Sequence, residues 1–423
     1  MIKVLFIIQS YPSEKSANVL CDTNIMKTFI KSNNYEVHCL CSKYSNQKSE
    51  EIIDGVHVHR VNRGLWWKLY SEAQFRNKKN GKYMIKINRL IMRIKQFIFI
   101  PLFPVYEPIF LYQMKKESVK LFDKEKFDVV FAEYNGLETI YAGWQLKCNR
   151  NILFIPIFWD SMSGGFRPKY LPSRYVDKRK YILEKKILYD CDQAIMMLSH
   201  RKHILKLYEN ESVLIDKIKF LDIPYLTINK MCSSPVFDKT KINIVFAGNM
   251  HHRNPCYFFK VLKESALDNI VVHFITKVED HRKIKEDAKE YNISIKLYDY
   301  MDHDILVNYL DDADILLNFG VDNPNAISGK IFEYIGFMKP IISTYSIDNE
   351  AAIRVLNKYP CSLLLDERKN PKEYQYSILE LLDFSKIVNV NEDSIKKTFK
   401  DNMPEAYLMY LETILKERDS FEQ

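Results

Sequence analysis

Short apolar runs that are typical of buried strands recur along this chain, each followed by a stretch with helical spacing. The runs over 3–8, 127–134 and 151–160 belong to a first series. A polar, proline-containing stretch over 227–241 interrupts the series, and the alternation then restarts with the run over 242–249. Alternating strands and helices predict parallel sheets covered by helices. We therefore expect an α/β fold with two tandem Rossmann-like domains.

The predicted boundaries follow that interruption. We expect an N-terminal domain over 1–226, a linker over 227–241 and a second domain over 242–391. The last helical stretch, residues 392–423, is long enough to return to the first domain, so we expect a C-terminal helix that packs back on it. A chain of 423 residues fits two domains better than one.

Composition indicates an ordinary globular protein, with 47% hydrophobic and 27% charged residues. The first eight residues read as a buried strand and not as a signal peptide, and no run of eighteen apolar residues predicts a membrane span. The eight cysteines lack C-x-x-C spacing, which favours reduced thiols in a cytoplasm over disulfides or zinc.

One short segment, residues 327–344, carries a lysine and a glutamate that a simple helix-to-strand passage does not require. Lys330 and Glu333 are three residues apart and therefore share a helix face. The flanking runs over 313–320 and 340–345 read as buried parallel strands. The pair thus lies at the carboxyl end of a strand, where open α/β sheets bind ligands.

That position favours a phosphate site. A helix N-terminus, here capped by Ser328 and Gly329, attracts anions, and Lys330 adds a full positive charge. Glu333 can accept two hydroxyl hydrogen bonds, as a ribose would donate. The alternative is a capped surface helix whose Lys330 and Glu333 are solvated.

The chain resembles the GT-B glycosyltransferases and, within them, glycosyltransferase family 4. The resemblance rests on residues 245–255, 306–319 and 328–344, covers essentially the whole second domain, and matches the first domain only in outline. It implies a cleft between the domains and a donor signature in which Lys330 contacts the diphosphate and Glu333 the ribose.

The chain also departs from the family pattern. The family often has two acids eight residues apart, but the position eight before Glu333 is Asn325. The loop after the first strand, which begins at Gln9, lacks the frequent pair of glycines.

The loop after the first strand of the second domain supplies further donor-site candidates. We predict that Gly248, Asn249 and Arg253 line the site, with Arg253 as the cation that the family often places there. A surface arginine is the alternative. The neighbouring His251 and His252 are interpreted as loop residues.

In the first domain, Asp160 follows an apolar strand and would face the cleft. The resemblance suggests a polar residue there, near the transferred sugar or the acceptor hydroxyl; a helix N-cap is the alternative. Ser163, Gly164, Gly165 and Arg167 would form the adjoining acceptor loop.

No metal site is predicted. Asp-x-Asp pairs occur at Asp190 and Asp192, at Asp302 and Asp304, and at Asp312 and Asp314. Such pairs arise by chance in a chain with 54 acids. His57 and His59 alternate along a short strand without a third ligand, which favours a surface strand over zinc.

The formal charge of +8 comes from one segment, residues 60–120, which holds fourteen Lys and Arg against three acids. Residues 84–103 interleave cations with apolar residues at helical spacing, and Trp66 and Trp67 precede them. This pattern favours docking on an anionic membrane surface. The alternative is a core helix with a solvated basic face; nucleic acid is disfavoured because no binding module is present.

The interpretation is a cytoplasmic, peripherally membrane-bound glycosyltransferase that moves a sugar from a nucleoside diphosphate donor to a lipid-linked or saccharide acceptor in surface-glycan assembly of the capsule or O-antigen type. The resemblance implies retention, without metal, and we predict catalytic roles for Asp160, Arg253 and Lys330. A nucleotide-sugar oxidoreductase or epimerase is the runner-up, although the chain lacks G-x-G-x-x-G after either first strand. A non-catalytic nucleotide-sugar-binding subunit is a third possibility.

Overall fold

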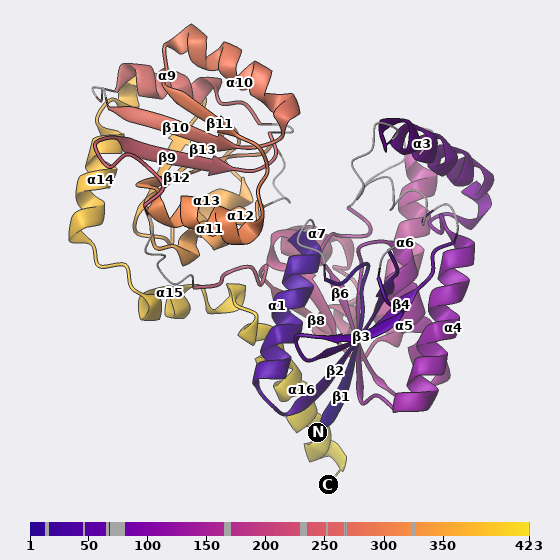
Figure 1. Ribbon diagram of the computed structural model, residues 1–423. Helices are drawn as coiled ribbons and strands as arrows, with labels where there is room; N and C mark the ends of the chain where they lie inside the picture. The colour runs from indigo at the N-terminus through magenta and orange to yellow at the C-terminus, as the bar shows by residue number, and fades with distance from the viewer. Residues whose placement is uncertain are drawn as a thin grey trace. The chain divides into compact units, whose positions relative to one another are not determined.

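The computed structural model describes residues 1–12, 17–44, 47–64, 67, 81–164, 171–228, 235–250, 253–265, 267, 269–322 and 327–422. The chain divides into two compact units. The first is Met1–Pro224 together with Pro404–Gln423, and the second is Tyr225–Met403. Each unit contains one sheet with helices on both faces (Figure 1). The predicted α/β fold with two Rossmann-like domains is confirmed.

The sheet of the first unit has eight strands in the order β3-β4-β2-β1-β5-β6-β7-β8. Their bounds are β1 Ile2–Ile7, β2 Tyr35–Ser42, β3 Glu50–Ile53, β4 Val56–Val61, β5 Val129–Glu133, β6 Leu153–Phe158, β7 Ala194–Met197 and β8 Ile218–Leu221. Neighbouring strands pair in parallel, except that the short edge strand β3 runs antiparallel to β4.

Helices cover both faces of this sheet. The helices of this unit are α1 Ala17–Lys31, α3 Gly81–Ile98, α4 Pro108–Glu125, α5 Leu137–Asn149, α6 Ser173–Asp190, α7 Arg201–Leu207, α8 Ser212–Asp216 and α16 Glu405–Glu422, with 3₁₀ turns η1 Ile100–Leu102 and η2 Leu198–His200. In β1, Phe6 meets Phe29 of α1 edge to face, while Leu5 and Ile7 join the core formed with α4 and α5. Alternate residues of β1 therefore face opposite layers, and both are apolar.

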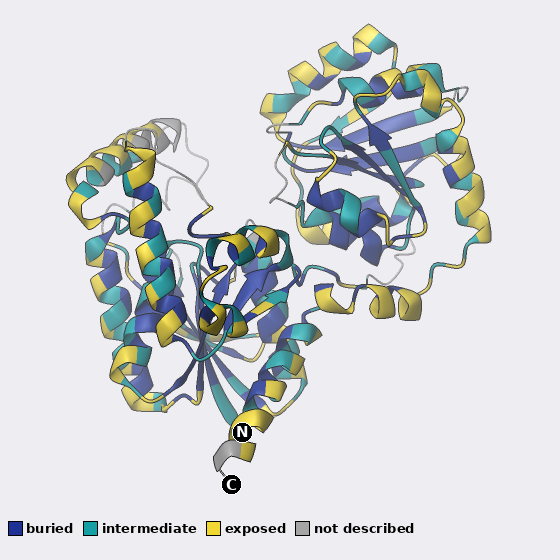
Figure 2. Cartoon of the chain, turned by 180° about the vertical axis from the view of Figure 1, so that it is seen from behind, coloured by how far each residue is buried: buried dark blue, intermediate teal, exposed yellow. Residues whose placement is uncertain are grey.

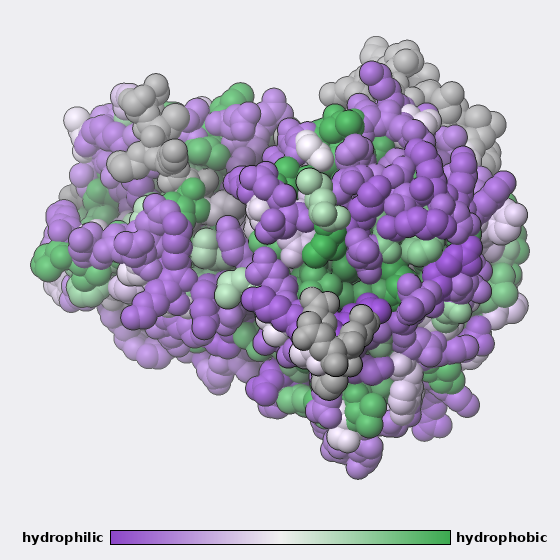
Figure 3. All heavy atoms as spheres, turned by 90° about the horizontal axis from the view of Figure 1, so that it is seen from below, coloured by the Kyte–Doolittle hydropathy of each residue, from purple (hydrophilic) through white to green (hydrophobic). Residues whose placement is uncertain are grey.

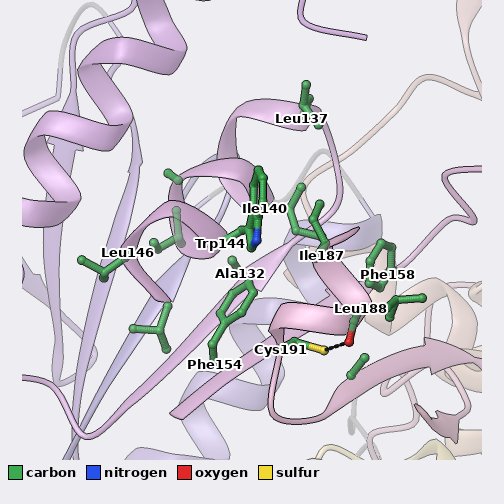
Figure 4. Packing of buried hydrophobic residues seen from close by; sticks show 14 of the residues in the cluster. Ala132, Leu137, Ile140, Trp144, Leu146, Phe154, Phe158, Ile187, Leu188 and Cys191 are labelled. Carbon is green, nitrogen blue, oxygen red and sulfur yellow. Dashed lines mark hydrogen bonds between the residues drawn. The ribbon is translucent and has the colours of Figure 1, made fainter. Parts of the chain in front are cut away.

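Close packing of α5 on the sheet depends on a glycine. A Cβ at Gly143 would lie 2.6 Å from the Cβ of Ala132 and 2.8 Å from Cε2 of Phe154. Figure 4 shows the cluster around this contact, with Ile140 and Trp144 of α5 above Ala132 and Phe154. Any side chain at position 143 would push α5 away from β5 and β6.

The second unit has six strands, all paired in parallel, in the order β11-β10-β9-β12-β13-β14. The strands are β9 Ile242–Ala247, β10 Ile270–Ile275, β11 Ile295–Tyr298, β12 Ile315–Phe319, β13 Ile341–Tyr345 and β14 Ser362–Asp366. The helices are α9 Cys256–Glu264, α10 Val278–Tyr291, α11 His303–Asp312, α12 Lys330–Gly336, α13 Ala351–Leu356, α14 Ser377–Ile387 and α15 Glu392–Thr398, with 3₁₀ turns η3 Pro371–Tyr374 and η4 Lys400–Asn402. In Figure 1, α9 and α10 lie on one face of the sheet, and α11, α12 and α13 on the other.

The strand order of the second unit creates a switch point. From the central strand β9 the chain moves outward through β10 and β11, and then returns to β12 on the other side of β9. The loops after β9 and β12 therefore leave the sheet in opposite directions. The space between their carboxyl ends is where ligands bind in sheets of this kind.

The C-terminal segment differs in part from the single helix expected over 392–423. It consists of α15, η4 and α16, and α15 belongs to the second unit. Pro404, directly before α16, has no N–H to continue the preceding turn. In α16, the hydroxyl of Tyr407 donates to the carbonyl of Asp222 at 3.0 Å, which ties this helix to the first unit.

Burial follows the layers: the central strands of both units are dark blue in Figure 2, whereas the edge strands β3 and β11 are only partly buried and the outer faces of the helices are exposed. Hydrophilic side chains cover most of the face seen in Figure 3. Among the helices of the described ranges, none combines the length and apolarity that crossing a membrane would need. Every cysteine in these ranges is a free thiol.

Candidate functional site

Two cations cross at the switch point of the second unit. Lys330 is the first residue of α12, which follows β12, yet its Nζ donates to the carbonyl of Ala247 at the end of β9. Arg253 follows β9, yet its Nε donates to the carbonyl of Phe319 at the end of β12, at 3.2 Å. Its Nη1 also donates to the carbonyl of Asn249 at 2.7 Å. Lys330 follows β12 but is held by β9, and Arg253 follows β9 but is held by β12.

Gly248 makes room for the lysine. Its φ is +154°, and a Cβ there would lie 1.9 Å from the Nζ of Lys330 and 2.9 Å from its Cε. No other residue fits this position without displacing the ammonium group. Tyr334, one turn after Lys330, accepts a hydrogen bond from the N–H of Ala247 at 3.1 Å and fixes α12 against β9.

The cations share a partly buried space. Burial lowers the pKa of Lys330 to about 8; the Glu333 carboxylate opposes this shift, and the nearby charge of Arg253 adds to it. Burial also lowers the pKa of Arg253 from its usual value. Both groups are held by neutral carbonyls, so an anion between them would stabilise their charged forms.

Glu333 is paired with a residue that the sequence analysis missed. Its side chain is buried, and Oε1 lies 2.9 Å from Nε2 of His303, the first residue of α11. The imidazole is 45% exposed, so it faces solvent beyond the carboxylate. No spacing rule connects position 303 to position 333, and only the fold brings them together.

The turn that leads into α12 differs from the expected cap. Gly329 is the N-cap residue, but no side chain caps the helix, so the predicted capping by Ser328 is wrong. The N–H of Ile331 donates instead to the backbone carbonyl of Ser328, at 3.2 Å. Buried apolar residues hold α12 in place: Ile331, Phe332 and Ile335. Because α12 has only seven residues, its dipole contributes little, and the anion-binding argument rests on Lys330 and Arg253.

A second buried carboxyl group lies at the end of β12. Glu350 is 3% exposed, and its Oε1 accepts from the N–H of Val321 at 3.3 Å. Its Oε2 is buried and has no hydrogen-bond partner among the described residues. A Cβ at Gly320 would lie 2.5 Å from that oxygen, so glycine is needed here as well. Burial raises the pKa of Glu350 to about 7.

The remaining catalytic candidate, Asp160, belongs to the first unit. It is exposed just beyond β6, and no helix begins within residues 161–164, so Asp160 is not a helix N-cap. In the adjoining loop, the Ser163 hydroxyl lies 3.1 Å from Nε2 of His203 and 3.2 Å from Oε1 of the buried Glu184. The N–H of Gly164 donates to the Ser161 hydroxyl at 2.9 Å.

Some residues named in the sequence analysis lie outside the described ranges: Trp66, Gly165, Arg167, His251, His252 and Asn325. The donor-site candidates Gly248, Asn249, Arg253, Ser328, Gly329, Lys330 and Glu333 all belong to the second unit.

No protein-family model matches the sequence, and no curated protein matches it. Solved structures match nearly the whole chain at low identity. Sucrose-phosphate synthase from Thermosynechococcus elongatus has a TM-score of 0.63 at 12% identity, over 99% of this chain and 100% of that one. Anabaena HepE in complex with UDP has a TM-score of 0.59 at 10% identity, over 97% and 100%.

A putative UDP-N-acetylglucosamine 2-epimerase from Listeria monocytogenes also matches, with a TM-score of 0.53 at 11% identity, over 98% of this chain and 97% of that one. At these identities the matches concern the fold. The chain has the two-domain GT-B fold that these structures share.

Proposed function

We propose that this chain is a glycosyltransferase of family 4 that moves a sugar from a nucleoside diphosphate sugar to a lipid-linked or saccharide acceptor in surface-glycan assembly of the capsule or O-antigen type. The observation that carries the proposal is the crossing of Lys330 and Arg253 at the switch point. Two cations that donate to neutral carbonyls at this position suit a diphosphate. The HepE structure of the same fold contains UDP, which makes uridine diphosphate the first ligand to try.

The chemistry follows from the charges. When the bond between the sugar and the diphosphate breaks, negative charge develops on the departing phosphate oxygen. Lys330 and Arg253 would lie against that charge and stabilise the transition state. Because the pKa of Lys330 is about 8, its ammonium is charged at neutral pH, and a bound diphosphate would raise that pKa further.

The other donor-site residues have supporting tasks. Gly248 has no side chain and therefore leaves room for the ammonium group of Lys330, and the carbonyl of Asn249 orients the guanidinium of Arg253. His303 fixes the carboxylate of Glu333, which would accept hydrogen bonds from the ribose hydroxyls. Two further candidates for donor contact precede the helix, Ser328 and Gly329.

The proposal includes retention at the anomeric carbon, which the resemblance to family 4 implies. It includes no metal ion, because both cationic side chains would stabilise the charge of the leaving group. On the acceptor side, we assign Asp160 of the first unit to the acceptor hydroxyl or the transferred sugar.

Turnover distinguishes the proposal from its alternatives. A transferase releases one nucleoside diphosphate per sugar transferred and needs an acceptor, which a membrane extract can supply. The protein should therefore release nucleoside diphosphate from labelled sugar donors only with the extract, and Lys330→Ala should lose this activity. A changed sugar stereochemistry without acceptor would indicate an epimerase. Donor binding without turnover would indicate a non-catalytic subunit.

We also propose that the enzyme docks on the anionic cytoplasmic face of a membrane through α3. This helix exposes apolar side chains on one face: Ile87, Leu90, Ile94, Phe97 and Ile98. Lys86 and Arg93, which are also exposed, flank that face. An exposed apolar face bordered by cations suits an anionic interface. Trp67 contributes less to the proposed membrane contact than expected, because Cζ of Arg63 lies 4.0 Å from the centre of its ring.

Co-sedimentation with vesicles tests the docking. Replacing Leu90 and Phe97, which are 58% and 72% exposed, by serine should weaken binding to anionic vesicles without changing donor affinity. Ile387→Ser in the second unit, at an 82% exposed position, is the matched control. A wild-type protein that ignores anionic vesicles at low salt, or that prefers duplex DNA, would contradict the membrane assignment.

A further inference from the structure

Three histidines gather on one face of the sheet of the first unit. Strands β2 and β4 run in parallel, with His38 opposite His57 and Leu40 opposite His59. This register stacks the His38 ring against both others, with ring centroids 4.6 Å from His57 and 5.5 Å from His59. The His38 ring is buried, whereas His57 and His59 are partly exposed.

Carboxylates complete the cluster. Oε1 of Glu36 lies 2.8 Å from Nε2 of His38, and the potential ligand atoms of Glu36, His38 and His57 all lie within 4.8 Å of one another. On the other side of the His38 ring, Nδ1 lies 3.2 Å from Nε2 of His59. Nδ1 of His59 in turn lies 3.8 Å from Oε1 of Glu50.

We propose that Glu36, His38 and His57 bind a divalent first-row transition metal ion, with zinc as the best fit, and that His59 positions the ring of His38. Two imidazoles and one carboxylate are a ligand set that zinc prefers, with one coordination position left for water. Because an imidazole nitrogen binds a metal ion in the plane of its ring, the partly exposed His57 ring would turn out of its stack on His38, which now has an interplanar angle of 14°. The site is separate from the donor site, which belongs to the second unit.

The hydrogen bonds around His38 support this assignment. Without a metal ion, Nε2–H of His38 donates to Glu36, so its Nδ1 must accept from His59, and the Nδ1 lone pair of a neutral His59 then faces the Glu50 carboxylate. With a metal ion on Nε2 of His38, every proton in the chain reverses. His38 then donates to His59, and His59 donates towards Glu50, which is the arrangement that orients metal-binding histidines.

Nearby lysines weaken the affinity of the cluster for a metal ion, because their charges repel it. Nζ of Lys3 lies 3.4 Å from Oε1 of Glu36, but it also pairs with Glu125 at 3.2 Å and can keep that partner. Lys124 lies near His59 and pairs with Glu125 at 3.1 Å.

The position of the cluster indicates what the metal ion would do. Glu36, His38 and His57 lie in the amino-terminal halves of β2 and β4, away from the carboxyl ends where sheets of this type bind substrates. A groove of about 660 Å³ lies on the His59 side of the cluster and is lined by His59, Glu50 and Lys124 among others. The ion would therefore join β2 to β4 without taking part in the sugar transfer.

The experiment uses the full-length protein, stripped with a chelator and then dialysed against zinc. Wild type should bind one equivalent, and its melting temperature should rise on binding. His57→Gln and Glu36→Gln should bind zinc at least tenfold more weakly and lose the shift in melting temperature. His281→Gln, which changes a histidine of α10 beside Asp299, should behave as wild type. Cobalt should give the visible absorption of a tetrahedral site in wild type and His281→Gln, but not in His57→Gln or Glu36→Gln.

Two results would overturn the proposal. The first is a wild-type protein that binds no zinc. The second is zinc binding of equal strength in wild type, His57→Gln and His281→Gln, because the ion would then bind elsewhere, for example at thiols. If His57→Gln fails to fold by circular dichroism, the isosteric Glu36→Gln decides the question alone.

Discussion

An alanine at position 248 tests whether Lys330 must pass over that residue to reach a ligand. The new methyl group would lie 1.9 Å from Nζ and 2.9 Å from Cε, so the ammonium has to leave its place while its charge stays on the protein. A hydrogen bond to a charged group contributes about 1.5–3 kcal/mol. We therefore expect Gly248→Ala to weaken nucleoside diphosphate binding by about 10- to 150-fold, nearly as much as Lys330→Ala.

The assay is calorimetric titration with uridine diphosphate, followed by the other nucleoside diphosphates, on wild type, both single variants and the double variant. If Gly248 acts only through Lys330, the double variant should bind as Lys330→Ala does, because the second change removes a contact already lost. Gly64→Ala is the control for backbone strain, since Gly64 has φ of +98° and no atom within 4 Å of the new methyl group. Additive losses in the double variant, or unchanged affinity in Gly248→Ala, would refute the reasoning.

Four further predictions concern charge and metal. Glu333→Ala should weaken nucleoside diphosphate binding in titrations but spare inorganic pyrophosphate, which has no ribose; equal losses would make the carboxylate structural. Because the pKa of Lys330 is about 8, binding measured from pH 7 to 10 should weaken as pH rises through that value, and a flat profile would contradict its contact with phosphate. Glu350 has a folded-state pKa of about 7 against an ordinary 4.5, so its contribution to stability is present below pH 4.5 and is lost as pH rises through 7. This loss amounts to about 3 kcal/mol in the free energy of unfolding at pH 8 relative to pH 4.5, and Glu350→Gln should remove it. Urea unfolding at the two pH values measures the loss, and an unchanged pH dependence in the variant would contradict the role given to Glu350. Chelator should leave nucleoside diphosphate release intact, whereas activity lost to chelator and restored by a divalent ion, in Glu36→Gln as well as in wild type, would show a metal-dependent transfer.

The parts of the site that sequence could predict are local. Lys330 and Glu333 lie three residues apart on one short helix, and the buried Ile331, Phe332 and Ile335 confirm its helical spacing. The tandem Rossmann-like fold was predictable for a related reason, since each buried strand is a continuous apolar run that stands out from its neighbours.

The parts that sequence could not predict depend on distant residues that meet in the fold. His303 reaches Glu333 from a different helix, and Glu350 reaches the end of β12 from the start of α13. His57 and His59 lacked a third ligand in the sequence because that ligand, His38, belongs to a neighbouring parallel strand. Strand order and register decide such meetings, and a single sequence does not contain them.

The crossing of the two cations also predicts how a donor would affect the second unit. Lys330 reaches the end of β9 and Arg253 the end of β12, so both loops at the switch point depend on side chains that repel each other. A bound diphosphate would attract both cations and so offset their repulsion. Each loop would then be held by its contact with the ligand as well as by its existing hydrogen bonds. The melting temperature should therefore rise with uridine diphosphate in wild type. It should rise much less in Lys330→Ala at the same ligand concentration, because stabilisation by a ligand follows the ratio of its concentration to its dissociation constant, and the variant has lost one of the two attractions. An equal rise in both proteins at the same ligand concentration would mean that the ammonium group of Lys330 does not contribute to diphosphate binding.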